Sequence, residues 1–266
     1  MKKILSQDGT AIAFDRAGKG PAIILVLAAF NERASGAPLA ERLSERFTVF
    51  NYDRRGRGAS GDTSPYAIAR EIDDLAALIT EAGGSASVFG HSSGALLALM
   101  AAVHGLPITK LALYEPPFLI KGGLAERSRT VSAQLTELLS EGLRGEAVEL
   151  YQTDLVGIPT EIVAQLRHAP FRSALERIAH TLVYDATILG DMEVLATQLG
   201  SIPTSTLLIS GEASPAVLGD AAQAVADALP HAQHRRLPGQ THDLVPPVLA
   251  PVLETFFADG SEKRIC

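Results

Sequence analysis

A serine flanked by glycines is the most informative feature of the sequence. Residues 90–94 read Gly-His-Ser-Ser-Gly, with an apolar strand pattern before them and an apolar helix pattern, 95–103, after them. In this context a sharp strand-to-helix turn holds the central serine, Ser92, with its hydroxyl outward, and the glycines leave room for the turn. The N-terminus of the helix directs unpaired N–H groups and the positive end of its dipole toward that hydroxyl. We interpret Ser92 as a candidate nucleophile.

A serine hydroxyl needs a base within hydrogen-bond reach before it can attack at neutral pH. Of the seven histidines, His242 follows the last predicted strand in the loop Pro-Gly-Gln-Thr-His-Asp, 238–243. That loop lies at the carboxyl edge of the predicted sheet, where open α/β folds bind ligands. His231 and His234 are three residues apart, but a metal site would need further ligands. We therefore expect His242 to be the base, with no metal and no cofactor. His91 lies beside the serine but on the wrong side of the turn, and we interpret the other five histidines as surface or core residues.

The elements that must position these residues alternate between strand and helix. Asp8-Gly9 between two short strand patterns predicts an N-terminal hairpin. Strand patterns alternate with helix patterns, which predicts right-handed crossovers and a largely parallel sheet. The predicted strands are 22–27, 47–52, 87–89, 108–114, 207–209 and 234–237, and the predicted helices include 38–46, 68–79, 95–103 and 221–229.

This alternation stops at Pro116 and resumes after Pro203, and the chain between them has only helix patterns. We expect a core of residues 1–115 and 204–266 with an all-helical insertion, 116–203. Two independent domains divided near residue 116 are disfavoured, because the resumed strands would have no sheet of their own to join.

In these motifs the chain resembles the α/β-hydrolase superfamily over essentially its whole length. Residues 52–60, Tyr-Asp-Arg-Arg-Gly-Arg-Gly-Ala-Ser, resemble the loop after the fourth strand in haloperoxidase-like and enol-lactonase-like members, and 113–117, Leu-Tyr-Glu-Pro-Pro, resembles their cap entry. The resemblance implies an eight-stranded, mostly parallel sheet flanked by helices, with a helical cap between strands six and seven. We interpret Arg54, Arg55 and Arg57 as a solvated turn rather than an anion site.

The oxyanion loop departs from the family's pattern. Members usually begin this loop with His-Gly after the third strand, where this chain has Ala28-Ala29-Phe30-Asn31. Because the oxyanion hole is built from backbone N–H groups, a change of side chain need not abolish it. By position, the resemblance implies that Phe30 and Ser93 supply the two N–H donors.

The acid of the triad also departs from the pattern. Ser214 occupies the position of the usual aspartate, three residues after Gly211, and a neutral hydroxyl cannot stabilise an imidazolium as a carboxylate does. Two carboxylates remain: Glu115, at the end of the predicted strand 108–114, where haloalkane-dehalogenase-like relatives sometimes keep their acid, and Glu212. We favour Glu115 and retain Glu212 as the alternative.

The resemblance then implies a cofactor-free serine hydrolase that acts on a small, largely apolar ester, lactone or related acyl compound through an acyl-enzyme. C–C bond hydrolysis and perhydrolysis use the same triad and are alternatives. A non-enzymatic ligand receptor on the same fold is an alternative of another class, which the Ser92 and His242 pair disfavours. We expect the helical insertion to line the pocket with some of the following residues: Phe118, Leu135, Leu139, Phe171 and Tyr184.

Composition narrows the possible partners. The sequence is 47% hydrophobic and 20% charged, the balance of a globular protein. Its net charge of −7 disfavours nucleic acid and anionic membranes. The single cysteine, Cys266, cannot form an intrachain disulfide.

The N-terminus lacks the apolar run of a signal peptide, and the longest apolar run, 22–30, is shorter than a membrane-spanning helix. We expect a cytoplasmic monomer or homodimer whose partner is a small-molecule acyl substrate.

Overall fold

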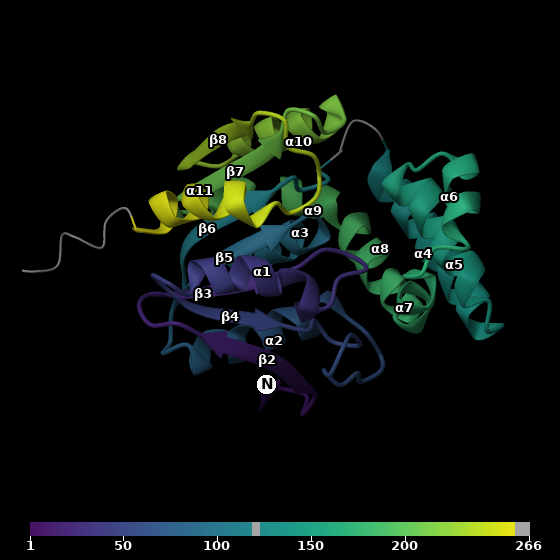
Figure 1. The fold of residues 1–266 in the computed structure, drawn as a ribbon, viewed down its shortest axis with the longest axis horizontal. Coiled ribbons are helices and arrows are strands. Elements are labelled where there is room, and N and C mark those ends of the chain that lie inside the picture. The colour runs from purple at the N-terminus through teal and green to yellow at the C-terminus, as the bar shows by residue number, and fades with distance from the viewer. Residues whose placement is uncertain (119–122, 259–266) are drawn as a thin grey trace, which may run out of the picture.

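Eight strands form one sheet in the computed structural model, which describes residues 1–118 and 123–258 (Figure 1). The order across the sheet is β1-β2-β4-β3-β5-β6-β7-β8. β1 and β2 form the expected antiparallel hairpin, β2 is antiparallel to β4, and all other neighbours are parallel. The predicted eight-stranded, mostly parallel sheet is therefore confirmed. The strands are β1 Lys2–Leu5, β2 Ala11–Ala17, β3 Ala22–Val26, β4 Thr48–Tyr52, β5 Ala86–His91, β6 Ile108–Tyr114, β7 Thr206–Gly211 and β8 Ala232–Leu237.

Helices cover both faces of the sheet, which explains why the central strands are apolar throughout. α1 (Arg33–Leu43) and α11 (Pro246–Ala258) cover one face, and α2 (Ile68–Glu81), α3 (Ser93–Val103) and α10 (Ala216–Ala228) cover the other. Successive residues of β3 alternate between the two layers: Ile23 and Leu25 pack beneath α1 and α11, whereas Ile24 and Val26 pack toward α2 and α3.

α1 begins five residues before the predicted helix start at Pro38. The carboxylate of Asp53 accepts a hydrogen bond from the N–H of Arg33 at 2.7 Å, so a residue distant in sequence satisfies one of the unpaired donors at the helix N-terminus. No local capping residue signals this start.

Helices fill the chain between β6 and β7, where the helical insertion was expected. They are α4 Leu124–Ser140, α5 Arg144–Tyr151, the π-helical segment η2 Gln152–Val156, α6 Thr160–Leu166, α7 Arg172–Arg177, the 3₁₀ turn η3 Ala179–Thr181, α8 Leu182–Gly190, α9 Met192–Ala196 and the 3₁₀ turn η4 Leu199–Ser201. α4 to α7 lie to one side of the sheet, whereas α8 and α9 run back toward the core and pack against α3 (Figure 1). The domain bounds 1–115 and 204–266 for the core and 116–203 for the insertion stay a prediction.

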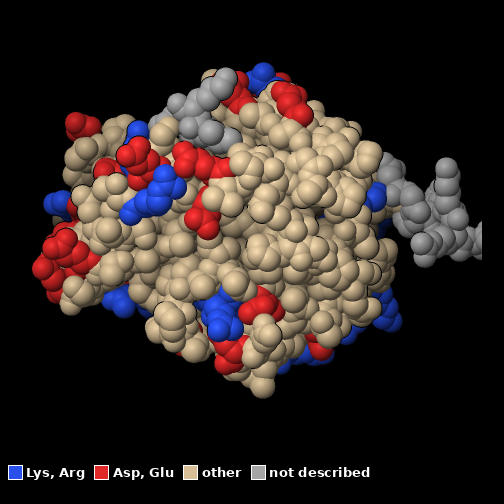
Figure 2. All heavy atoms as spheres, turned by 180° about the vertical axis from the view of Figure 1, so that it is seen from behind, with Lys and Arg blue, Asp and Glu red and all other residues tan. Residues whose placement is uncertain are grey.

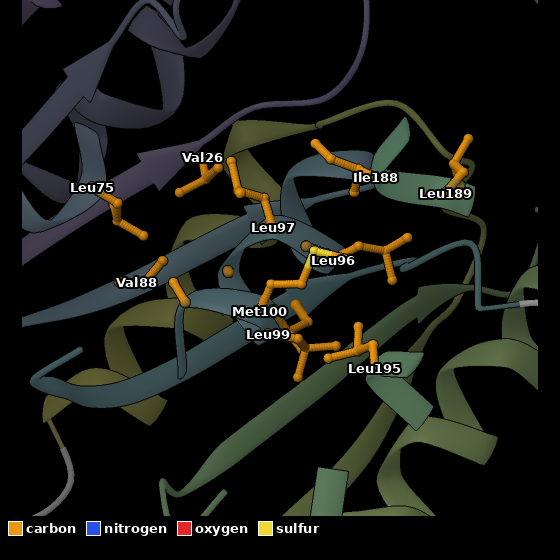
Figure 3. Packing of buried hydrophobic residues seen from close by; sticks show 14 of the residues in the cluster. Val26, Leu75, Val88, Leu96, Leu97, Leu99, Met100, Ile188, Leu189 and Leu195 are labelled. Carbon is orange, nitrogen blue, oxygen red and sulfur yellow. The ribbon is translucent and has the colours of Figure 1, made fainter. Parts of the chain in front are cut away.

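α8 and α9 join the hydrophobic core at α3. Ile188, Leu189 and Leu195 lie beside Leu96, Leu99 and Met100 of α3 (Figure 3). All six of these side chains are buried. The base of the helical insertion is therefore packed onto the helix that follows Ser92.

Two further features concern the outside of the molecule. Among residues 1–118 and 123–258, no helix combines the length and apolar character needed to cross a membrane. On the face turned away from the view of Figure 1, acidic and basic side chains are interspersed around a largely uncharged surface (Figure 2). Cys266 lies outside the described residues.

Candidate active site

Ser92 occupies the turn between β5 and α3 in a strained backbone conformation, with φ 53° and ψ −121°. A non-glycine residue at positive φ is costly and marks a position that the surroundings hold in place. Both flanking glycines are required: a Cβ at Gly90 would lie 2.6 Å from the Cα of Ala95, and a Cβ at Gly94 would lie 2.3 Å from the carbonyl oxygen of Val26. The turn therefore has the tight geometry that the motif predicts.

His242 and Glu115 meet at the carboxyl edge of the sheet. Nδ1 of His242, in the loop between β8 and α11, lies 2.6 Å from Oε2 of Glu115. Glu115 follows β6 with φ 45°, is completely buried, and accepts a second hydrogen bond from the N–H of Gly211 at 2.8 Å. Burial alone would raise the pKa of Glu115, but the hydrogen bonds from His242 and Gly211 outweigh it, so this pKa lies below its usual value. Glu115 is thus a buried carboxylate that is hydrogen-bonded to the imidazole of His242.

The alternative acid, Glu212, is exposed to solvent, and Asp220 is exposed on α10. The hydroxyl of Ser214, at the family's usual acid position, has no hydrogen-bond partner among the described residues. The carboxylate that contacts His242 is therefore Glu115, the residue that the sequence favours.

Two further hydrogen bonds hold the backbone of the His242 loop. Nε2 of His91 donates to the carbonyl oxygen of His242 at 3.0 Å, and the hydroxyl of Tyr114 donates to that of Thr241 at 2.5 Å. Burial, reinforced by the neighbouring His242, lowers the pKa of His91 to about 3, so its ring is neutral and its Nε2 carries the proton. Sequence reasoning missed this role of His91, because its signal is a contact with a residue 151 positions away.

A cavity of about 710 Å³ contains both Ser92 and His242 on its wall. Most of the remaining wall is apolar, and it includes Phe30, Tyr151, Leu155, Ile158, Leu189, Leu218 and Leu244. The π-helical segment η2 and the turn after it supply several of these residues, so the helical insertion does form one side of the cavity.

The five residues expected to line this cavity are not among its lining residues. Phe118 and Leu135 are buried in the packing of the insertion, Leu139 is partly buried there, and Phe171 is 49% exposed. Tyr184 stacks on Tyr66, with ring centroids 3.9 Å apart. The expectation was wrong because helical periodicity identifies an apolar face but not which of several neighbours that face contacts.

The N–H of Phe30, in the loop after β3, is available at the cavity. The N–H of Ala29 donates to Oγ of Ser93 at 3.0 Å, and that of Asn31 donates to the carbonyl oxygen of Ala28 at 3.3 Å. Phe30 lies between them with φ 61°, and no hydrogen bond among the described residues engages its N–H. Ser93 is the first residue of α3, so its N–H has no acceptor within the helix. Both expected oxyanion donors, Phe30 and Ser93, thus lie on the cavity wall.

Arg54, Arg55 and Arg57 do not form a solvated turn. Each is at most 2% exposed, and each pairs with buried carboxylates. Arg54 binds Glu71 and Asp185, Arg55 binds Asp74, and Arg57 binds Asp185. That interpretation was wrong because the carboxylates come from α2 and α8, which no local pattern connects to this loop. Within the described part of the chain, no cluster of three or more His, Cys, Asp or Glu side chains is suited to a metal ion.

The chain is similar to known hydrolases. It is 49% identical to an alpha/beta hydrolase from Sphaerobacter thermophilus, whose crystal structure superposes with a TM-score of 0.89 over 96% of this chain and 100% of that chain. It is 29% identical over 210 residues to the 2-(acetamidomethylene)succinate hydrolase of Mesorhizobium japonicum, a match that covers 75% of this chain and 73% of that protein. It is also 36% identical over 104 residues to the N-formylmaleamate deformylase of Pseudomonas putida, a match that covers 38% of this chain but only 39% of that protein.

These likenesses support a hydrolytic function. A model of the Alpha/beta hydrolase family matches residues 26–255, most of the chain. The resemblance drawn from the sequence motifs is therefore confirmed, and the chain belongs to the alpha/beta hydrolase family.

Proposed function

We propose that this protein is a serine hydrolase that cleaves a small, largely apolar ester, lactone or related acyl compound. In this proposal Ser92 is the nucleophile, His242 the general base and Glu115 the acid of the triad. One observation carries it: the serine at the strained turn and the histidine bound to a buried carboxylate line the same cavity. Without an orienting carboxylate, an imidazole would be a poorly placed base.

The reaction follows from the positions of these groups. Because Nδ1 of His242 is bound to Glu115, its Nε2 is available to take the Ser92 proton as Oγ attacks the substrate carbonyl. The carboxylate of Glu115 then stabilises the imidazolium. The imidazolium returns the proton to the leaving group, and an acyl-enzyme remains. Water, activated by the same imidazole, releases the acid.

The developing oxyanion is bound by the N–H groups of Phe30 and Ser93. Removing one such donor typically costs about 2.7–4 kcal/mol of transition-state stabilisation. The N–H of Ala29 is already bonded to Ser93 Oγ, which favours Phe30 as the donor from this loop. Phe30 reaches the required left-handed conformation although it is not glycine.

The cavity wall supports the proposed substrate class. A volume of about 710 Å³ is in the range of small-molecule sites, and the wall is dominated by aliphatic and aromatic side chains. An acyl chain would bury its apolar surface against Leu155, Ile158 and Leu189, and each buried CH₂ group would contribute about 0.8 kcal/mol.

Substitution of the nucleophile tests the proposal. Ser92→Ala is expected to lose essentially all turnover of p-nitrophenyl acetate and p-nitrophenyl butyrate. The matched control is Ser87→Ala: Ser87 lies on β5, the strand that leads to Ser92, is hydrogen-bonded to Thr109 and does not line the cavity. The control should retain wild-type kcat. Full activity in Ser92→Ala, or equal losses in both variants, would contradict the assignment.

A further inference from the structure

Asp185 is a buried carboxylate that joins the helical insertion to the core. It lies on α8 and is completely buried. Its oxygens accept hydrogen bonds from Ser93 Oγ at 2.7 Å, Arg54 Nη1 at 2.8 Å and Arg57 Nη2 at 2.5 Å. Burial alone would raise the pKa of Asp185, but the two arginines and the Ser93 hydroxyl outweigh it, so the group is ionised.

The three partners of Asp185 all reach the loop after β3. Ser93 Oγ accepts the N–H of Ala29 at 3.0 Å. Arg57 donates to the carbonyl oxygen of Ala28 at 2.7 Å, and Arg54 donates to that of Leu27 at 3.3 Å. The two consecutive peptide groups 27–28 and 28–29, which lead into Phe30, are therefore held by side chains that Asp185 itself binds.

We propose that Asp185 is a positioning residue that sets the geometry of the oxyanion hole through Ser93 and Arg57. Ser93 has two functions in this arrangement: its N–H is one oxyanion donor, and its hydroxyl fixes the peptide next to the other donor, Phe30. This inference rests on the proposed function, because it concerns how that site binds a tetrahedral intermediate.

Energetics favour a positioning role over a simple stabilising one. A buried ion pair costs desolvation that its Coulomb attraction barely repays, so such pairs contribute little net stability. α8 is already fixed to the core by Ile188 and Leu189, which pack against α3 (Figure 3). The ionic contacts therefore orient the side chains that hydrogen-bond to the loop after β3, whereas apolar packing attaches α8 to the core.

The loop after β4, which carries Arg54 and Arg57, also supplies a matched control. Arg55 and Asp74 form an ion pair at 2.7 Å that is as buried as the Asp185 network. Arg55 also donates to Asp8 and to the carbonyl oxygen of Arg70, and its hydrogen bonds do not include the peptides of 27–29. Asp74→Asn therefore perturbs a comparable buried ion pair without touching the oxyanion loop.

Binding of an alkyl trifluoromethyl ketone tests the inference directly. Ser92 Oγ adds to the ketone carbon while its proton passes to His242, and the resulting oxyanion occupies the oxyanion hole. The corresponding methyl ketone, which does not form a stable adduct, reports ground-state binding. Inhibition constants for both, with kcat, KM and Tm, are measured for wild type, Ser93→Ala, Asp185→Asn and Asp74→Asn.

We expect Ser93→Ala and Asp185→Asn to bind the trifluoromethyl ketone about 10- to 100-fold more weakly and to lose kcat by a similar factor. Their KM and methyl-ketone affinity should change by less than about threefold, as expected for an interaction that is specific to the transition state. Asp74→Asn can lower Tm but should leave both inhibition constants unchanged.

Two results would overturn the inference. If a folded Ser93→Ala variant binds the trifluoromethyl ketone with wild-type affinity, this inference is overturned and the proposed function is not. Because this variant is near-isosteric, it decides the matter if Asp185→Asn does not fold. A wild-type protein that forms no adduct would overturn the proposed function, and this inference with it.

Discussion

Replacing Glu115 by glutamine changes one atom of the triad and should stop the reaction almost completely. The N–H of Gly211 donates to Oε1 of the native carboxylate, and His242 Nδ1 lies 2.6 Å from Oε2. In the variant, the amide oxygen must face Gly211, because otherwise the amide NH₂ would face the N–H of Gly211 and two donors would meet. The amide NH₂ then faces Nδ1, the ring proton moves to Nε2, and Nε2 can no longer accept the Ser92 proton.

The magnitude follows from this tautomer argument. The corresponding change in a serine protease triad lowers kcat by about 10⁴-fold. We expect a loss of about 10³- to 10⁴-fold in kcat here, equal to about 4–5.5 kcal/mol at 1.36 kcal/mol per tenfold. KM should change little, because Glu115 is not among the residues that line the cavity. The assay is steady-state hydrolysis of p-nitrophenyl butyrate at pH 8.

The control for this variant is Glu212→Gln. Glu212 is exposed, so its substitution should change kcat by less than about twofold. If Glu212→Gln loses more activity than Glu115→Gln, the acid lies in the loop after β7 and the tautomer argument fails.

Three other perturbations have defined outcomes. Gly94→Ala places a Cβ 2.3 Å from a β3 carbonyl oxygen, so we expect a loss of about 1–3 kcal/mol in urea unfolding, whereas Gly200→Ala, with no atom within 4 Å, should be neutral. Ile158→Trp narrows the cavity and should lower the butyrate-to-acetate ratio of kcat/KM about tenfold; Ile162→Trp, at an exposed position of α6, should not. Burial alone would raise the pKa of Asp185, but its ion pairs with two arginines lower this pKa by more, so the net shift is downward. As pH falls, Asp185 therefore takes up its proton in the unfolded chain before it does so in the folded one, and the free energy of unfolding should fall as pH drops below about 4. Denaturation at pH 6 and 3.5 measures this, and equal stability at both would contradict it.

The fold could be predicted because the signals that specify it are local. The apolar run at 22–27 and the strand pattern at 108–114 coincide with β3 and β6 within one residue. Gly90 and Gly94 mark the turn because the turn itself excludes side chains there. In each case the residues that carry the signal also form the structure.

The features that could not be predicted depend on contacts between distant segments. The burial of Arg54 requires Asp185, which lies 131 positions away on α8. The start of α1 requires Asp53, 20 positions beyond it. The choice between Glu115 and Glu212 stayed open in the sequence because either could reach a flexible loop; the hydrogen bond of Glu115 to His242 distinguishes them only in three dimensions. The lining of the cavity depends on how the helical insertion packs, which its periodicity does not specify.

Covalent labelling tests the central claim most directly. The folded protein is treated with a fluorophosphonate, and the site of modification is identified by peptide mass spectrometry in the wild type and in His242→Ala. We expect one adduct, on Ser92, formed at least about 100-fold more slowly when His242 is absent. An unmodified Ser92 in folded wild-type protein, or equally fast labelling without His242, would contradict it.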